Sequence, residues 1–303
     1  MNAQQSLTTR AWWEMAILAL IWGGSFLSFA IVLREIGVFT TVAARIVGGA
    51  LALWVYILAR GLKMPRSPRI WGAFLVMGLL NNVIPFSLIA WGQLSIASGL
   101  TSILNASTAV MGVLVAAVVF SDERLTARKT VGVLLGFVGV SVAIGLSALS
   151  EFNPTSLAQL AILGSSLSYA LSAAWARVAF KGLAPQVAAA GMVTASALFI
   201  VPVALWFEGV PTFDYTAATW TALVHLSVIA TALAYLLYYR VLAMAGSGNL
   251  LLVTLLVAPV AIVLGTLVLG EDLPRRAYLG FAFLAAGLLV LDGRILKRAG
   301  PRA

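Results

Sequence analysis

A small set of polar and aromatic side chains stands out because each lies deep inside a long apolar stretch of the sequence. They are Trp22, Ser25, Asn81, Asn82, Asn105, Tyr169, His225 and Tyr235. Amides and hydroxyls that faced lipid would lose their hydrogen bonds, so we expect them to face a wet cavity or another helix. As a set they are suited to hydrogen-bonding the polar head of a small molecule while aromatic rings contact its apolar part.

Each of these residues also has a structural interpretation. Ser and Thr often bond the backbone of their own helix or join tightly packed helices, and this interpretation is favoured for any single hydroxyl. Asn81, Asn82 and Asn105 are harder to bury, so a cavity role and an interhelical role are equally favoured for them. Trp22 and Tyr169 lie in mid-span rather than at a membrane interface, which favours a place in a cavity wall.

Two ionisable side chains lie within the apolar stretches. Arg45 is about seven residues into its stretch, hence ~10 Å from the nearer boundary at 1.5 Å per residue, and His225 lies at a similar depth in another. Intramembrane ionisable residues are functional candidates by default. For Arg45 the favoured interpretation is nonetheless structural, either snorkelling to the outer headgroups or tying helix ends together. For His225, a neutral ring bonded inside the bundle and a substrate contact are equally favoured.

The apolar stretches lack most of the residue types that enzyme catalysis requires. The apolar stretches hold no Asp or Glu in their interiors, His225 is the single histidine, and the chain has no cysteine. Paired carboxylates, metal clusters and disulfides are therefore not expected, and no cofactor is predicted. A Ser–His dyad is the one catalytic arrangement left open, and no catalytic signature accompanies it.

The composition indicates that the segments carrying these residues lie in a lipid bilayer. The chain is 62% hydrophobic and 10% charged, with a mean hydropathy of +1.04, whereas a soluble domain has ~25% charged residues. Ten stretches are continuously apolar and long enough for a membrane-spanning helix of ~20 residues, which favours helices over a barrel. The predicted spans are 12–33, 38–59, 70–92, 97–120, 127–148, 156–176, 185–207, 216–239, 247–269 and 275–295. The predicted fold class is an all-α polytopic membrane protein with ten transmembrane helices.

Charge sets the predicted orientation of these helices. Of the 19 Lys and Arg residues, all but four fall in segments on the side that holds the N-terminus; the exceptions are Arg34, Arg45, Arg275 and Arg276. Because basic loops face the cytoplasm, we predict a multi-pass protein of a bacterial-type inner (plasma) membrane with both termini cytoplasmic. This sidedness explains the net charge of +9 without nucleic acid, for which the short loops leave no binding domain.

The two halves of the chain resemble each other. At one constant offset, Glu123 falls on Glu271 and Gly139 on Gly287, at matching places in the span pattern. Two copies with five spans each must have opposite orientations, a recurrent design among transporters that open to each side in turn. We therefore predict two inverted five-helix repeats around a central cavity. The predicted organisation is a cytoplasmic leader at 1–11, repeats at 12–148 and 156–295, an external linker at 149–155 and a cytoplasmic tail at 296–303.

Several motifs resemble those of a known family. They are Trp22-Gly23-Gly24-Ser25-Phe26, the segment from Ala90-Trp91-Gly92 to Leu100-Thr101-Ser102, Asp122-Glu123-Arg124-Leu125-Thr126 and Gly270-Glu271-Asp272-Leu273-Pro274. In their joint placement the chain resembles the EamA family of the drug/metabolite transporter superfamily, over essentially its whole length. The resemblance implies ten helices around a central cavity and export of small metabolites, often amino acids. Within the family the chain looks nearest to the amino-acid exporters of the YddG type.

These observations favour a secondary carrier that exports small metabolites by alternating access, amino acids with apolar or aromatic side chains foremost. Export of other amphipathic metabolites or drugs is the alternative, and an intramembrane enzyme, a channel or a scaffold is the alternative of another class. The expected partners are a small-molecule substrate and the lipid bilayer, and a monomer is plausible. No ATP-binding subunit is implied, because the chain has no phosphate-binding loop. Without interior carboxylates, we predict facilitated diffusion or weak coupling, with His225 the single titrating candidate.

Overall fold

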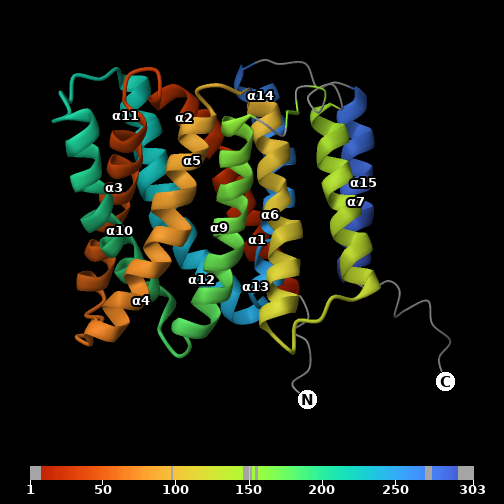
Figure 1. The fold of residues 1–303 in the computed structure, drawn as a ribbon, viewed down its shortest axis with the longest axis horizontal. Helices are drawn as coiled ribbons and strands as arrows, with labels where there is room; N and C mark the ends of the chain where they lie inside the picture. The colour runs from red at the N-terminus through yellow and green to blue at the C-terminus, as the bar shows by residue number, and fades with distance from the viewer. Residues whose placement is uncertain are drawn as a thin grey trace.

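The computed structural model describes residues 8–96, 98–145, 150, 152–153, 156–269 and 275–292, and helices dominate these ranges (Figure 1). No β-strand occurs in them, so the predicted all-helical architecture is confirmed. Residues 1–7 of the predicted leader, most of the predicted linker and the whole predicted tail lie outside the described residues. Six helical segments are apolar and long enough to cross a bilayer: Thr9–Val32, Val38–Ala59, Pro68–Gly92, Leu157–Ala179, Pro185–Glu208 and Ala217–Ala245. Two shorter apolar helical segments accompany them, Ile103–Val119 and Ser247–Val260.

The helices follow one another with short connections. The first half of the chain forms α1 (Thr9–Gly23), α2 (Ser25–Val32), α3 (Val38–Ala59), α4 (Pro68–Gly78), the π-helix η1 (Leu79–Val83), α5 (Ile84–Gly92), α6 (Ser98–Val119) and α7 (Ala127–Ile144). The second half forms α9 (Leu157–Ala179), α10 (Pro185–Glu208), α11 (Ala217–Val224), the π-helix η2 (His225–Leu233), α12 (Ala234–Ala245), α13 (Ser247–Leu250), α14 (Val253–Leu269) and α15 (Arg275–Asp292). The helix predicted at 216–239 continues to Ala245, and the one predicted at 247–269 is interrupted between α13 and α14.

Two wide π-helical turns distinguish the helices at the centre of the molecule. Pro85 has no N–H to donate, so the carbonyl four residues earlier loses its α-helical partner, and η1 lies just before this proline. In η2 the Thr231 hydroxyl donates to the Leu226 carbonyl, five residues earlier, at 2.8 Å. Pro202 and Pro259, by contrast, each lie inside one continuous α-helix. Short π-helical segments occur frequently at functional sites.

The two ends of the helix bundle differ in charge. One end, here called the basic end, holds the start of α1 and the α3–α4, α9–α10 and α12–α13 connections, and it is the lower end in Figure 1. At the opposite end, Glu208 at the end of α10 accepts from the backbone N–H groups of Phe39 and Thr40 at 2.9 and 2.8 Å. This carboxylate joins α10 to the positive N-terminus of α3.

Glu35 makes a second connection at the opposite end. Its carboxylate accepts from the Thr216 hydroxyl at 2.6 Å and from the Thr216 backbone N–H at 2.9 Å. These two hydrogen bonds lower the pKa of the Glu35 carboxyl. The contact therefore stabilises the fold at pH values above the usual carboxyl pKa, and it is lost as the pH falls through the lowered value.

The helices α7 and α15 pair closely along one edge of the bundle, on the right in Figure 1. Glycines allow this approach: a Cβ atom at Gly139 would lie 2.5 Å from the backbone nitrogen of Leu284 and 2.7 Å from the carbonyl oxygen of Gly280. Neither of these backbone atoms can move aside as a flexible side chain could. Both helices are nearly free of polar residues between their ends, which fits a peripheral role.

Replacing Gly139 by Leu should therefore force α7 and α15 apart. Overpacking of this kind destabilises by roughly 1–3 kcal/mol, so the thermal unfolding midpoint of the purified protein in detergent should fall. The matched control is Gly72→Leu in α4, because no heavy atom lies within 4 Å of a Cβ at that position. Equal midpoints for the two variants would contradict the proposed close packing.

Candidate functional site

A central cavity lies where the polar faces of the helices meet. Its volume is about 80 Å³, well above the roughly 10–15 Å³ that a cavity needs to hold one water molecule. Both halves of the chain contribute to its wall: Trp22, Ser25, Phe26, Phe29, Arg45, Asn81, Phe86, Ile89, Asn105, Thr108, Tyr169, Tyr235, Tyr238, Leu251, Thr254 and Val257. The wall thus combines amides, hydroxyls and one guanidinium with a majority of aromatic and aliphatic surface.

The structure brings most of the predicted residues to this cavity. Six of them line it, namely Trp22, Ser25, Asn81, Asn105, Tyr169 and Tyr235. Asn82 is fully buried beside the cavity but does not line it. His225 also lies off the cavity, at the start of η2, where its Nδ1 is 2.9 Å from the Ser28 hydroxyl. Whether any of these residues contacts a substrate remains a prediction.

Asn82 holds three helices together through its amide. It accepts a short hydrogen bond from the Tyr235 hydroxyl of α12 and donates to the Ser196 hydroxyl of α10 at 2.8 Å. Its neighbour Asn81 accepts from the Ser172 hydroxyl of α9 at 2.9 Å. The π-helical turn η1 therefore places two successive amides so that each reaches a different neighbouring helix.

Trp22 and Arg45 converge on a single carbonyl of η2. The Trp22 indole N–H donates to the Ala230 carbonyl at 3.0 Å, and the Arg45 Nη2 donates to the same oxygen at 3.2 Å. Arg45 Nε also donates to the Thr231 hydroxyl at 2.9 Å. A carbonyl in a π-helical turn accepts such side-chain donors because the α-helical ladder is interrupted there.

Arg45 does not snorkel to a headgroup, so the first of the two structural interpretations offered from the sequence is wrong. The residue is 3% exposed and lies in the cavity wall. Its guanidinium carbon lies 3.8 Å from the centre of the Phe86 ring and 5.3 Å from that of Phe29. The expectation failed because it counted depth along one helix and could not see the aromatic rings that α2 and α5 bring to the same place.

Four buried polar atoms in the cavity wall have no hydrogen-bond partner among the described residues. They are the Ser25, Thr108 and Tyr238 hydroxyls and the Asn105 Oδ1. Each of these side chains is at most 8% exposed. Because unsatisfied buried polar atoms are costly, by about 1–3 kcal/mol each, their gathering in one wall indicates a place where water or a polar ligand binds.

Several lining residues were not selected from the sequence. Phe26 and Phe29 follow Trp22 at helical spacing, so a periodic aromatic face was the signal that could have found them. Phe86, Leu251 and Val257 lie in largely apolar stretches of the sequence. No sequence signal separates such residues from those that face lipid, because both environments favour the same side chains.

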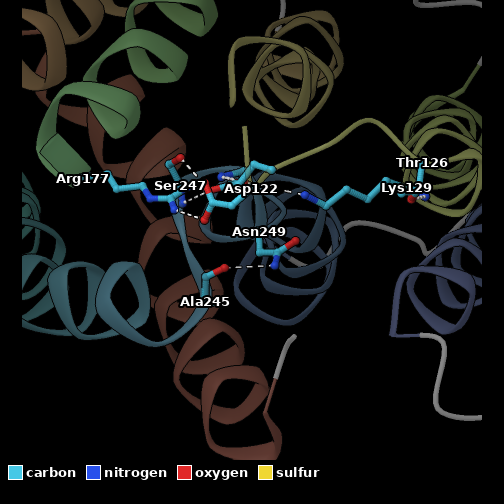
Figure 2. Close-up of polar contacts among 9 residues, drawn as sticks. Asp122, Thr126, Lys129, Arg177, Ala245, Ser247 and Asn249 are labelled. Carbon is cyan, nitrogen blue, oxygen red and sulfur yellow. Dashed lines mark hydrogen bonds and ion pairs between the residues drawn. The ribbon is translucent and has the colours of Figure 1, made fainter. Parts of the chain in front are cut away.

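A polar cluster lies at the basic end of the molecule (Figure 2). Glu123, between α6 and α7, is 4% exposed, and it accepts from the Ser247 and Gly248 backbone N–H groups of α13 at 3.1 Å each. Arg177 of α9 donates to Glu123 at 2.5 Å and also pairs with Asp122. Lys129 of α7 approaches the Glu123 carboxylate at 3.7 Å.

Glu123 does not cap the helix that follows it. The start of α7 is capped by the Thr126 hydroxyl, which accepts from the Lys129 N–H at 3.2 Å. Glu123 instead binds the start of α13, which belongs to the other half of the chain. Its carboxylate therefore links α7, α9 and α13 at the basic end.

Comparison with known proteins supports the resemblance seen in the sequence. The sequence profile of the EamA-like transporter family matches residues 11–145 and again residues 156–291, which confirms that resemblance. The uncharacterized transporter YvbV of Bacillus subtilis is 25% identical over 292 residues, 94% of this chain and 92% of that protein. A probable terminal-alkyne amino-acid exporter of Streptantibioticus cattleyicolor is 25% identical over 293 residues, 96% of each chain. One crystal structure, 19% identical in sequence, has the same fold with a TM-score of 0.79 and covers 96% of this chain and 98% of its own.

We predict from the contacts of Glu123 that the basic end opens when the Glu123 carboxylate loses its charge. Glu123→Gln keeps the side-chain shape but leaves Arg177 and Lys129 without their shared partner, a loss of several kcal/mol for a buried ion pair. A cysteine placed in the cavity at Thr108 should then react at least ~10-fold faster with a membrane-impermeant thiol reagent supplied at the basic end, the change that about 1.4 kcal/mol gives. The chain has no native cysteine to interfere.

The control for this experiment is Glu35→Gln, which removes a charged contact at the opposite end. It should leave the reaction rate from the basic end unchanged. An unchanged rate in a well-folded Glu123→Gln variant would show that the cluster does not close this end.

Proposed function

Because this chain belongs to the EamA-like transporter family, we propose that it is a secondary carrier that exports small amphipathic metabolites by alternating access. Amino acids with apolar or aromatic side chains are the proposed substrates. The observation that carries the proposal is the central cavity, where unpartnered polar atoms and aromatic rings meet between apolar helices from both halves of the chain. A small amphipathic solute has the chemistry that fits such a wall.

The proposed mechanism uses two inverted five-helix repeats. Its support is that the family profile matches the chain twice, at 11–145 and 156–291. In addition, α1 begins at the basic end whereas α9 ends there (Figure 1), as an odd number of spans per repeat requires. Inverted repeats exchange their conformations when such a carrier opens to the other side. In this scheme the Glu123 cluster closes the basic end while solute exchanges at the opposite end.

Amino acids are proposed on the basis of one relative and of the cavity. The Streptantibioticus protein, which matches the chain over 96% of its length, is named a probable amino-acid exporter. In this chain, Asn and hydroxyl groups would bind the polar head of the solute. The rings of Trp22, Tyr169 and Tyr235 would contact its side chain.

We place the protein in the plasma membrane with its basic end in the cytoplasm. The support is the positive-inside rule, since Lys and Arg concentrate in segments at that end. Both termini would then be cytoplasmic. Coupling to a proton gradient is proposed to be weak or absent, and His225, the single histidine, lies outside the cavity wall.

Removal of a cavity ring should lower transport of a solute that it contacts. Trp22→Ala and Tyr169→Ala should each reduce uptake of L-phenylalanine into proteoliposomes by ~10-fold, because loss of a buried aromatic contact is worth about 1.5–3 kcal/mol. Asn82→Ala should do the same by releasing Tyr235. Trp54→Ala is the matched control, since Trp54 bonds Thr194 of α10 outside the cavity. If the three test variants transport as well as the control, the cavity is not the transport site.

The inverted orientation has a direct test in single-cysteine labelling. Ser67 and Val210 lie in corresponding connections, each between the second and third spans of its repeat, so inversion puts them on opposite faces of the membrane. In intact cells an impermeant thiol reagent should label a cysteine at Val210 and label one at Ser67 only after permeabilisation. Labelling of both cysteines from the same face would rule out the inverted repeat.

A further inference from the structure

Arg45 carries a positive charge that the described part of the protein does not neutralise. The residue is 3% exposed, and none of the ion pairs among the described residues includes it; those pairs join Glu14, Asp122 or Glu123 to other bases. Its two direct hydrogen bonds go to neutral oxygens, those of Thr231 and Ala230. A guanidinium in this position lacks the anionic partner that buried charges normally have.

The guanidinium also has N–H groups that do not donate a hydrogen bond to the described residues. Arginine has N–H groups on three nitrogens, and the residues that the structure describes engage Nε and Nη2 of Arg45 but neither N–H of Nη1. Phe86 and Phe29 cover the flat face of the group at 3.8 and 5.3 Å. Stacking of this kind fixes the plane of the guanidinium and leaves its edge free for in-plane hydrogen bonds. Arg45 lies in the cavity wall, so an anion that enters the cavity can reach that edge.

A purely structural role would not require this arrangement. The connection between α3 and η2 uses single neutral-acceptor hydrogen bonds, which an uncharged donor can also make. A charge inside the membrane is expensive, and such residues are usually paired or functional. Among planar anions, a carboxylate matches the guanidinium fork with two parallel hydrogen bonds.

We infer that Arg45 is the carboxylate-binding residue of the cavity and that the solutes carried are small organic carboxylates with an apolar or aromatic side chain. This inference rests on the proposed carrier function and specifies what it recognises. A bound carboxylate would neutralise the guanidinium during the time that both are out of water. Arg45 would then orient the bound solute and select solutes that carry a negatively charged carboxylate.

The remaining polar groups of the cavity suit the second charge of an α-amino acid. The unpartnered Asn105 Oδ1 and the Ser25 and Thr108 hydroxyls are acceptors, and an ammonium group has three donors. Trp22 lines the same wall, and the face of an indole ring attracts a cation by its quadrupole. A zwitterion would therefore satisfy donors and acceptors that the empty fold leaves open.

The test compares solutes that differ only in the carboxylate. Proteoliposomes holding wild type, Arg45→Gln or Arg45→Lys are given labelled L-phenylalanine and labelled L-phenylalaninamide. Wild type should take up the acid at least ~10-fold faster than the amide, since a charge-assisted pair is lost with the carboxylate. Arg45→Gln should lower uptake of the acid ~10-fold or more and leave uptake of the amide unchanged. Arg45→Lys, which keeps the charge but not the fork, should fall between them.

The matched control is Arg60→Gln, which removes an arginine stacked on Tyr56 at the end of α3, away from the cavity. Its preference for the acid should equal that of wild type. The comparison of acid and amide in wild type needs no variant, so it remains informative if Arg45→Gln fails to fold.

The outcomes separate the two proposals. If wild type transports acid and amide at equal rates, the carboxylate role of Arg45 is overturned while the carrier function stands. If wild type prefers the acid and Arg45→Gln keeps that preference, another group binds the carboxylate and the inference also fails. If no solute of either kind is transported, the proposed function itself fails, and the inference with it. If 3-phenylpropionate, which lacks the amino group, is transported as fast as L-phenylalanine, the carboxylate role of Arg45 stands. The proposed contacts with the ammonium group are then overturned.

Discussion

The structure depends on one constraint: inside a hydrocarbon layer, every polar group must find its partner within the protein or in an enclosed wet space. Arg45 shows the constraint most clearly. Its guanidinium is covered by two phenylalanine rings, bonded on one edge to Thr231 and Ala230, and open on the other edge to the cavity. The same constraint explains why Asn81 and Asn82 bridge helices and why the unpartnered hydroxyls gather where they border the cavity.

The interior and the basic end are connected through short, irregular elements. The π-helix η2 presents the carbonyl that receives both Trp22 and Arg45. At the basic end α13, a helix of four residues, is bound by Glu123 immediately before Leu251 enters the cavity wall. A displacement of α13 would therefore alter the cavity and the closure of the end at once. Local breaks in regular helices supply this coupling, because a continuous helix has no spare backbone groups for side chains to bind.

Sequence reasoning succeeded where the signal is one-dimensional. Apolar length located the helices, and polar residues at mid-depth identified six of the residues that line the cavity. It failed where the answer depends on a neighbour in space. The depth of Arg45 along α3 could not reveal Phe86 of α5, and the motif around Glu123 could not reveal that its partner is Ser247 of the other half. The π-helical turns were also not predicted from the sequence, because their patterns of side chains resemble those of α-helices.

The most direct test of the account is a structure of the protein bound to 4-bromo-L-phenylalanine, whose bromine marks the ring unambiguously. We predict the bromine within the cavity beside Trp22 or Tyr169, and both carboxylate oxygens within hydrogen-bonding distance of Arg45. A bromine outside the cavity, or a carboxylate held by other groups while Arg45 keeps its present contacts, would contradict the account.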